Sequence, residues 1–495
     1  MTVSLSEIGY QAPFLALATG GILLFVLEAF TQKASSRRWL MWLALATVGV
    51  AGGGCLMVLR HLGDHTGYGL MHDMLIADRY SAVVTLLFLV GAALTLLMSA
   101  DYLREHDTEY GEYYGLVLLA TAGMAMLVMA GDFVTVFLGI ETMSLAVYVL
   151  TGSFRRSRRS SEAAMKYFLT GAFATGFLLY GIALVYGMSG TTNLAEIGAK
   201  GQALAGKPLF LIGEMLLLVA FGFKIAVVPF HMWAPDAYEG APTPVTAFMA
   251  AGVKAAGITA LLRVFLTAFG GNLLPFGRTG WASILGVLAA LTMTLGNLAA
   301  LRQENLKRML AYSSISHAGY LLIGVVAAGI GQSKLALPAV LFYLAAYTFT
   351  TVGAFGVLAW LGRRGDERAL LDDWSGLATR HPGAALAMTI FLLSLGGMPP
   401  TAGFFGKFYV FRAAMQAWDD QLVWLVVVAV SNSVISAYYY LRPVVAMYFR
   451  EPTRPMQPLA TGPITFVLVA SSLLVLEMGL LPSPWLDFMS RAAMR

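Results

Sequence analysis

Residues 218–248 read LVAFGFKIAVVPFHMWAPDAYEGAPTPVTAF, and this stretch decides the fold. It begins as an apolar run typical of a membrane-spanning helix and is interrupted at Pro229, five residues after Lys224. Proline removes a backbone N–H and clashes with the preceding turn, so we predict a helix break near Pro229. Broken backbone at membrane depth is tolerated only where it is buried in protein or lines a wet cavity. The stretch therefore predicts an interior polar site in a membrane protein.

A second interrupted stretch, LLSLGGMPPTAGFFGKFYVF at 392–411, has the same design. Pro399 and Pro400 lie in mid-span and predict a second break, with Lys407 beyond them. The two breaks lie about five helices apart, and an odd spacing turns the second copy upside down. We therefore predict two inverted five-helix repeats, at about 112–269 and 281–449. Interrupted helices at matching places in inverted halves are typical of a transport site.

The composition supports an integral membrane protein. Hydrophobic residues make up 58% of the 495 residues and charged ones 12%, with a mean hydropathy of +0.73. A soluble chain carries about twice that share of charge. The apolar runs suffice for about fourteen helices at about 20 residues each, and no polar interval is long enough for a soluble domain. We predict an all-α fold with a single transmembrane domain, residues 1–495.

Lysine and arginine are distributed unevenly between the two sets of alternate loops. The set that contains Arg155, Arg156, Arg158 and Arg159 holds about twice as many as the other, which predicts that it faces the cytoplasm. Both termini then lie outside, in agreement with an even number of helices. The N-terminal residues lack the basic segment of a signal peptide, so the first apolar run is expected to be retained.

Motifs for other chemistry are absent from the sequence. The single cysteine, Cys55, excludes a disulfide framework, a cysteine zinc site and a cysteine-ligated iron–sulfur cluster within the chain. There is no P-loop, no GxGxxG at a strand–helix junction, no HExxH and no EF-hand loop, and no metal site is predicted. The basic residues are spread over loops, which argues against nucleic-acid binding. A partner or an ion gradient must therefore supply the energy.

Six ionisable residues lie inside apolar runs, where a charge is expensive unless it is paired or hydrated: Lys166, Lys224, Lys254, Lys407, Glu141 and Glu214. A chain with so many ionisable groups at membrane depth is predicted to move charge. His317 and His231 are further candidates because histidine titrates near neutral pH. A lone core histidine, however, is often only a satisfied polar residue.

Several of these groups also have a structural interpretation. Lys166 follows a basic run and could extend its amine to the cytoplasmic edge. Glu214 lies near the outer end of its span, where a structural role is favoured. Glu141 could merely neutralise a nearby lysine, although a pair that can be broken is also a proton switch. Arg263 lies nearer a span end and is interpreted as an anchor.

Five segments together resemble the antiporter-like subunits of respiratory complex I: FLGIETMSLAVYVL (137–150), EAAMKYFLTGAFATGFLLYG (162–181), GFKIAVVPFHMWAPDAYEGAPTPVTAF (222–248), NLKRMLAYSSISHAGYLL (305–322) and GGMPPTAGFFGKFYVF (396–411). The resemblance covers about residues 110–450, which we interpret as an antiporter-like core. Within that family the chain is most similar to the subunit N group of bacterial NADH–quinone oxidoreductases. The reasons are the lysine in GFFGKFYVF, the segment SAYYYLRPVVAMYF (436–449) and the fourteen-helix length.

The resemblance implies a role in proton translocation for six residues. Glu141 matches a glutamate that pairs with the lysine of the first broken helix, which is Lys224. Lys254 matches the central lysine of the eighth helix, and His317 lies on the tenth. Lys407 matches the terminal lysine of the second broken helix. Lys166 matches a sixth-helix lysine of subunit N. Outside these six, His231 is a possible accessory residue because it lies beside the first break and a tryptophan.

The resemblance also implies the setting of the chain. No cofactor is expected in it, whereas FMN, iron–sulfur clusters, NADH and quinone are implied in partner subunits. The implied partners are M-like and small K-, J- and A-like membrane subunits and, through them, a peripheral arm, in the lipid of a bacterial inner membrane. Two alternatives stay open: a subunit of the related multi-subunit cation/proton antiporters, and a structural spacer. The deep lysines argue against a spacer, which apolar residues would stabilise better.

Overall fold

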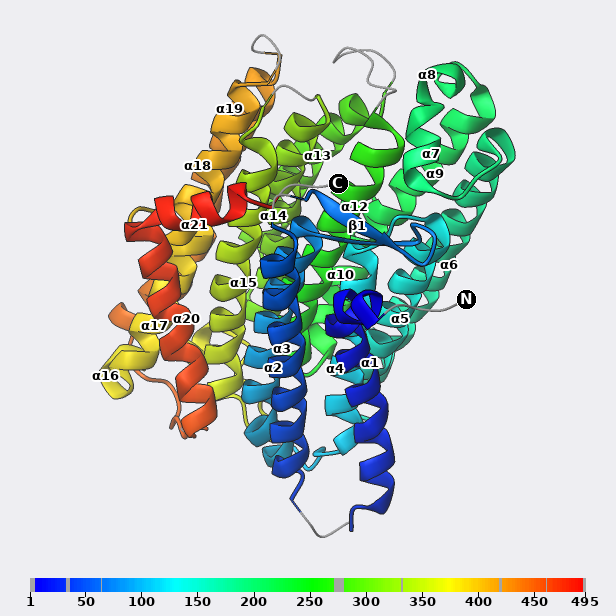
Figure 1. The fold of residues 1–495 in the computed structure, drawn as a ribbon. Coiled ribbons are helices and arrows are strands. Elements are labelled where there is room, and N and C mark those ends of the chain that lie inside the picture. The colour runs from blue at the N-terminus through cyan, green and yellow to red at the C-terminus, as the bar shows by residue number, and fades with distance from the viewer. Residues whose placement is uncertain are drawn as a thin grey trace.

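The computed structural model describes residues 5–32, 36–63, 65–270, 280–330, 333–417, 421–459 and 461–492. It is a bundle of helices (Figure 1), which confirms the predicted all-α fold. The first half contains α1 (Leu5–Phe30), α2 (Arg38–His61), α3 (Arg79–Glu105), α4 (Gly111–Val128), α5 (Phe133–Thr151), α6 (Arg158–Ser189), α7 (Leu194–Ala199), α8 (Gly201–Leu204), α9 (Pro208–Lys224), α10 (Trp233–Gly240), α11 (Thr243–Phe248), the π-helical turn η1 (Met249–Val253) and α12 (Lys254–Ala268). The second half contains α13 (Trp281–Leu301), α14 (Leu306–Gly329), α15 (Ala336–Leu361), the 3-10 helix η3 (Leu371–Trp374), α16 (Leu377–Arg380), α17 (Pro382–Gly396), α18 (Ala402–Met415), α19 (Val423–Phe449), α20 (Gly462–Leu480) and α21 (Pro482–Ser490).

A short antiparallel hairpin, β1 (Gly67–Leu70) and β2 (Leu75–Asp78), adds to the helical fold. Its turn places Met71, His72 and Asp73 at positive φ. The hairpin leads directly into α3, where the Asp78 carboxylate caps the helix by accepting a hydrogen bond from the backbone N–H of Ser81 at 2.8 Å. The sequence analysis did not predict this hairpin, because four-residue strands lie below the length at which alternation is recognisable.

Twelve segments of the described chain are long and apolar enough to cross a membrane, which makes the chain a multi-pass membrane protein. They are α1 to α6, the continuous segment Thr243–Ala268 formed by α11, η1 and α12, and α13, α14, α15, α19 and α20. The fourteen-helix count, the single domain and the inverted repeats stay predictions. The predicted position of the two termini concerns residues 1–4 and 493–495, which lie outside the described residues.

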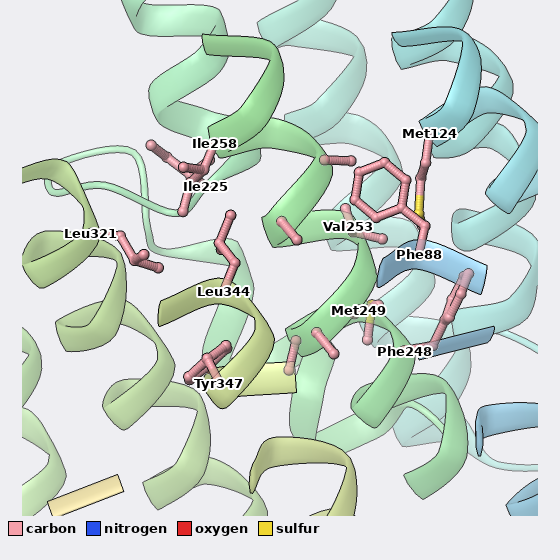
Figure 2. Packing of buried hydrophobic residues seen from close by; sticks show 14 of the residues in the cluster. Phe88, Met124, Ile225, Phe248, Met249, Val253, Ile258, Leu321, Leu344 and Tyr347 are labelled. Carbon is pink, nitrogen blue, oxygen red and sulfur yellow. The ribbon is translucent and has the colours of Figure 1, made fainter. Parts of the chain in front are cut away.

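Three spanning segments form the centre of the bundle. The most apolar window is completely buried in Thr243–Ala268 and in α15, and 94% buried in α14, against 28% in α1, α2 and α6. Figure 2 shows how Met249 and Ile258 of the first segment pack with Leu344 of α15 and their neighbours. The outer helices instead turn apolar side chains such as Phe173 and Val50 outward. A charged residue on a central helix is therefore shielded from lipid by protein.

The first interruption separates α9 from α10. α9 ends at Lys224 and α10 begins at Trp233, so the chain leaves the helical path around Pro229. Ala226 adopts a φ of +59°, and the Val228–Pro229 peptide bond is cis. The indole Nε1 of Trp233 donates to the carbonyl oxygen of Phe223 at 3.0 Å, which satisfies one of the backbone groups that the break sets free.

The second interruption separates α17 from α18. α17 ends at Gly396, and Gly397 adopts the left-handed conformation with a φ of +78°. The Pro399–Pro400 bond is cis, and α18 begins at Ala402. A glycine is required at position 397 because a β-carbon there would lie 2.9 Å from the Lys407 side chain.

Arg263 is not a surface anchor, so that interpretation was wrong. Its side chain is fully buried, and its guanidinium donates to both carboxylate oxygens of Asp78, at 2.6 and 2.8 Å. The same group donates to the carbonyl oxygen of Val128 and lies 4.9 Å from the ring centre of Tyr80. One ion pair thus joins α12 to α3 and α4, and fixes one end of the central segment that carries Lys254.

We expect Asp78→Asn to destabilise the protein by about 3–5 kcal/mol, because it leaves a buried guanidinium without its counter-charge. Asparagine also caps helices well, so Asp78→Asn removes the negative charge but keeps the N-terminal cap of α3. The thermal unfolding midpoint of the purified protein in detergent measures the effect. Arg364→Met is the control, since its ion pair with Asp107 is exposed and is worth about 1 kcal/mol or less. Equal midpoints for the two variants would contradict the assignment.

Candidate functional site

Lys224 is the last residue of α9, and its side chain is buried. Its Nζ donates to Ser144 Oγ at 2.6 Å and lies 3.3 Å from Tyr148 OH, both on α5. The amine also lies 5.5 Å from the centre of the Tyr148 ring, within the range of a cation–π contact. Hydroxyls both donate and accept, so these partners can accompany either a charged or a neutral amine.

Glu141 lies on α5, one helical turn before Ser144, and is half-buried. Its carboxylate accepts a hydrogen bond from Thr175 Oγ1 of α6 at 2.6 Å. Among the described residues, no ion pair of 4.0 Å or less joins Glu141 to Lys224. The charge of Glu141 nevertheless acts on Lys224. The structure thus shows the two groups without a direct ion pair, with the amine held by Ser144 and the carboxylate by Thr175.

We expect Glu141→Gln to impair proton translocation and Glu141→Asp to impair it less, because aspartate keeps the charge. A double-mutant cycle with Lys224→Met tests whether the two residues act as a unit, for which a coupling of about 0.5–3 kcal/mol is expected. Thr175→Val is the control, since it removes the present hydrogen-bond partner of the carboxylate but keeps its charge. Additive losses would argue that the pair is not a functional unit.

Lys254 is the first residue of α12, directly after the π-helical turn η1. Its buried amine donates to the carbonyl oxygen of Ser314 on α14 at 2.6 Å and also contacts the Ser314 hydroxyl. No carboxylate of the described chain lies within 4.0 Å of this amine. Isolated π turns inside helices occur frequently at functional sites. The amine therefore relies on neutral oxygens, a setting that favours its neutral form.

His317 lies on α14, three residues after Ser314, and is buried. Its Nδ1 lies 2.7 Å from Tyr343 OH and its Nε2 3.1 Å from Tyr440 OH. The charges of both Lys254 and Lys407 act on the imidazole. Because each ring nitrogen has a hydroxyl partner, a proton can arrive at one nitrogen and leave from the other.

Lys407 lies on α18, directly after the second interruption, and is buried. Its Nζ donates to the carbonyl oxygen of Gly396 at 3.1 Å and lies 4.7 Å from the ring centre of Tyr320. Gly396 is the last residue of α17, so its carbonyl has no partner within that helix. The partial negative charge at a helix C-terminus favours a nearby cation. The break therefore supplies the acceptor for the lysine.

The helices place these groups in one order. α9 packs against α12, α12 against α14, and α14 against α18. Lys224, Lys254, His317 and Lys407 lie on these four helices in the same sequence. Among the described residues no hydrogen bond links one of the four directly to the next. A proton could therefore pass from one of these residues to the next only through water or after movement of the side chains.

The other predicted residues do not join this series. The Lys166 side chain is 47% exposed and pairs at 2.8 Å with both Glu162 and Asp236. Glu214 is buried, with a carboxylate oxygen that has no hydrogen-bond partner among the described residues. His231 is partly exposed and follows the first break, and its Nδ1 also lacks such a partner. Their functional assignment stays a prediction.

The neutral partners of the buried lysines and of His317 were not predicted from the sequence. Ser144 and Tyr148 hold Lys224, Ser314 holds Lys254, and Tyr343 and Tyr440 flank the histidine. A helical spacing of three residues links Glu141 to Ser144 and Ser314 to His317, and this spacing was the available signal. Within the described residues, no group of three or more His, Cys, Asp or Glu side chains could hold a metal ion.

Comparisons with known proteins identify the family. A family described as NADH:quinone oxidoreductase/Mrp antiporter, TM, matches residues 130–436. The protein named NADH-quinone oxidoreductase subunit N 1 of Sorangium cellulosum is 48% identical over 500 residues, covering 98% of each chain. The chain belongs to the subunit N family. The predicted resemblance is thereby confirmed, and the family match lies within the segment of about 110–450 on which it was based.

Two solved structures extend the comparison. A chain of respiratory complex I from Thermus thermophilus with bound aureothin is 35% identical, with a TM-score of 0.79, and the match covers 96% of this subunit N family member and 98% of that chain. A chain of the Mrp complex from Dietzia has a TM-score of 0.85 over 99% of this chain and 97% of its own, at 24% identity. The second likeness shows that the fold is shared and no more.

Proposed function

We propose that this subunit N family member translocates protons as a membrane-arm subunit of an NADH–quinone oxidoreductase, driven by redox chemistry in other subunits. The observation that carries the proposal is the series of four buried ionisable residues on successively packed helices. Burial of so many ionisable groups without a counter-charge destabilises the fold, and their presence therefore indicates a functional role. The names of the relatives support the same assignment.

The first step is a proton switch at Lys224. When the Glu141 carboxylate approaches the amine, the ammonium form is stabilised; when it moves away, burial favours the neutral amine. The observed separation, with Ser144 bound to the amine, corresponds to the second condition. Lys224 Nζ then gives its proton to Lys254 Nζ through water. Because the two amines and the carboxylate interact, they titrate as a coupled group.

The second step carries the proton outward. Lys254 Nζ releases it towards His317, whose two nitrogens face Tyr343 and Tyr440. The other ring nitrogen of His317 passes a proton to Lys407 Nζ. After Lys407 has released this proton on the outer side, its amine again donates to the carbonyl oxygen of Gly396. The two interruptions supply the free backbone groups that hold water along the route.

The proposal includes a setting for the chain. Both termini would lie in the periplasm, with the arginine-rich loops in the cytoplasm of a bacterial cell. The partners would be M-like and small K-, J- and A-like subunits and, through them, the peripheral arm. FMN, iron–sulfur clusters, NADH and quinone would be bound by those other subunits, with no redox site in this chain. The two inverted repeats, 112–269 and 281–449, would each supply one broken helix.

Copurification tests the proposal against its alternative, a subunit of a cation/proton antiporter. A tagged chain isolated in mild detergent should bring with it an arm that oxidises NADH and reduces quinone. In vesicles, NADH should drive proton uptake without a requirement for Na⁺ or K⁺. Isolation together with small antiporter subunits, and proton movement that depends on a cation gradient, would favour the alternative. A spacer would leave proton uptake unchanged when the buried lysines are replaced.

A further inference from the structure

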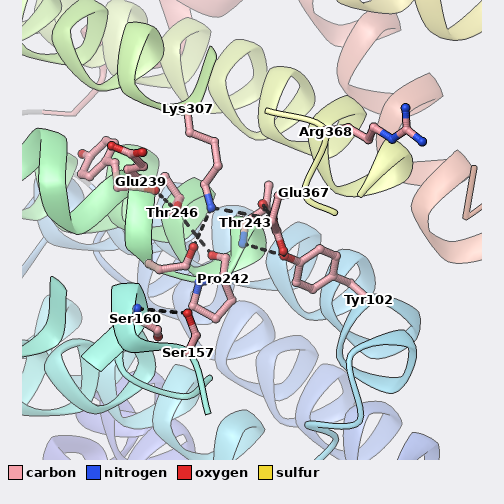
Figure 3. A network of polar contacts seen from close by, with 12 residues as sticks. Tyr102, Ser157, Ser160, Glu239, Pro242, Thr243, Thr246, Lys307, Glu367 and Arg368 are labelled. Carbon is pink, nitrogen blue, oxygen red and sulfur yellow. Dashed lines mark hydrogen bonds and ion pairs between the residues drawn. The ribbon is translucent and has the colours of Figure 1, made fainter. Parts of the chain in front are cut away.

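A polar cluster lies outside the lysine series, around Glu367 in the loop between α15 and η3 (Figure 3). The carboxylate accepts hydrogen bonds from Tyr102 OH at 2.6 Å and from Thr243 Oγ1 at 2.9 Å. His106 Nε2 lies 3.2 Å from it, and Lys307 Nζ 3.8 Å. Four segments that are distant in the sequence therefore meet at one carboxylate.

The cluster borders a cavity at the surface. His106 lines a cavity of about 540 Å³, together with Arg155, Arg156 and Arg364. These arginines belong to the loops that the charge bias assigns to the cytoplasm. The His106 side chain is 93% buried and lines this cavity, with its Nδ1 donating to the carbonyl oxygen of Tyr102 at 2.7 Å and its Nε2 beside Glu367. It is therefore a titratable group that connects the aqueous phase to the interior of the bundle.

From the cluster, polar groups continue towards Lys254. Thr243 begins the central segment Thr243–Ala268 that carries Lys254. Lys307 and Ser314 lie on one face of α14, two turns or about 10 Å apart. Ser314 is the partner of Lys254. Between Thr243 and Ser314 the transfer would depend on water and on movement of the side chains.

We propose that His106 and Glu367 form the inlet through which cytoplasmic protons reach Lys254. The inference rests on the proposed function and adds the route of uptake to it: protons enter the series at Lys254, and from there water also reloads Lys224 when the Glu141 carboxylate approaches its amine. His106 collects the proton from the cavity, and Glu367 orients the imidazole and connects it to Thr243. In the transfer, the N–H bond at His106 Nε2 breaks and an O–H bond forms on Glu367. The pair becomes neutral, and the carboxyl proton moves on through the Thr243 hydroxyl and water to the neutral amine of Lys254. Because His106 Nδ1 keeps its proton for the carbonyl oxygen of Tyr102, the next proton from the cavity binds at the vacated Nε2 through water.

The electrostatics of the pair suit this role. Burial lowers the pKa of His106, but its close contact with the Glu367 carboxylate and its hydrogen bond to the carbonyl oxygen of Tyr102 outweigh burial and raise it. Burial raises the pKa of Glu367, but the charge of Lys307 and the hydrogen bonds from His106 and Tyr102 bring it down to about 2. The imidazole is thus the loaded donor at rest. Movement of Lys307 away from the carboxylate would raise the carboxyl pKa and open the inlet.

Other charges also face the pair. They are Glu105 beside His106, Glu239 near Lys307, and Asp107, Arg155, Arg156 and Arg364 around the cavity. Asp107 offers a matched control, because it lines the same cavity and pairs with Arg364, whereas among the described residues it forms no hydrogen bond with Glu367 or Thr243. Its φ is positive, a conformation that asparagine tolerates.

The test uses inside-out vesicles that contain the whole complex, with initial NADH-driven proton uptake measured across neutral pH. His106→Gln should slow uptake about ten-fold, a modest value for loss of a proton-transfer group because water can substitute in part. Added imidazole should restore part of the rate. Glu367→Gln should slow uptake similarly without rescue, and Asp107→Asn should leave the rate unchanged. Ferricyanide reduction by NADH and native gels report assembly.

Wild-type rates in assembled His106→Gln and Glu367→Gln vesicles would overturn the inlet. If the Glu367 variant does not assemble, His106→Gln and its rescue by imidazole decide alone. Lys254→Met separates this outcome from a failure of the proposed function. If Lys254→Met abolishes uptake while the inlet variants are normal, only the inlet is wrong. If Lys254→Met pumps normally, the proposed relay is wrong, whatever the inlet variants do.

Discussion

Replacing Lys224 with methionine should lower redox-driven proton translocation by about 100-fold or more, the range expected for loss of an obligatory proton-transfer group. The amine is buried and is held by Ser144 and Tyr148, so methionine removes the proton carrier while approximately filling its volume. Oxidation of NADH by the peripheral arm with an artificial acceptor should be unaffected. The measurement is the ratio of protons translocated to electrons transferred in sealed vesicles.

Lys224→Arg should fail as well, since a guanidinium does not give up its proton. This variant keeps the positive charge and so separates proton transfer from a merely electrostatic role. Lys200→Met is the matched control, because Lys200 donates to the carbonyl oxygen of Ser189 near the end of α6 and lies outside the series. An unchanged ratio of protons to electrons in Lys224→Met would refute the switch.

Lys407→Met should produce the second large effect, a stop or strong slowing of proton release on the outer side. In the proposed series this side chain is the last carrier, and methionine cannot donate to the carbonyl oxygen of Gly396. Lys407→Glu should keep part of the activity, because the protonated carboxylic acid can still donate to that oxygen. Release is followed with a pH-sensitive dye on the outer side of oriented vesicles.

The state of Lys254 distinguishes a blocked exit from a damaged protein. In Lys407→Met, difference infrared spectroscopy should still show Lys254 exchanging its proton. Lys334→Met serves as the control, since Lys334 precedes α15 and lines a surface cavity away from the series. Normal release in Lys407→Met would show that protons leave before α18, and the proposed order would be wrong.

Much of this architecture could be predicted because its signals are local. A lysine inside an apolar run and a proline at mid-span can each be recognised within one helix length, and Lys224 and Pro229 occur together in such a run. The structure places the two interruptions around Pro229 and around Pro399–Pro400. The physical reason is that a charge at membrane depth and a proline inside a helix each cost free energy, whichever neighbouring helices pack around them.

What could not be predicted depends on packing between distant segments. Arg263 was misinterpreted because its partner Asp78 lies 185 positions away and no local pattern connects them. Ser144 and Ser314 could not be distinguished from the many hydroxyls that satisfy themselves within a helix. The separation of Glu141 from Lys224 is a property of one conformation, and residue types at fixed positions do not specify it.

The π-helical turn before Lys254 has a consequence for register. A π turn holds one extra residue, and each residue advances a helix by about 100°. If the π turn moved from η1 into α12, Lys254 would rotate about the helix axis by about that angle, and its amine would leave Ser314. Thr243 and Arg263, at the two ends of the segment, would stay in place. Deleting Ala250 would remove the extra residue and fix one register. A deletion variant that pumps at the wild-type rate would show that the segment works as a rigid rod rather than as a ratchet.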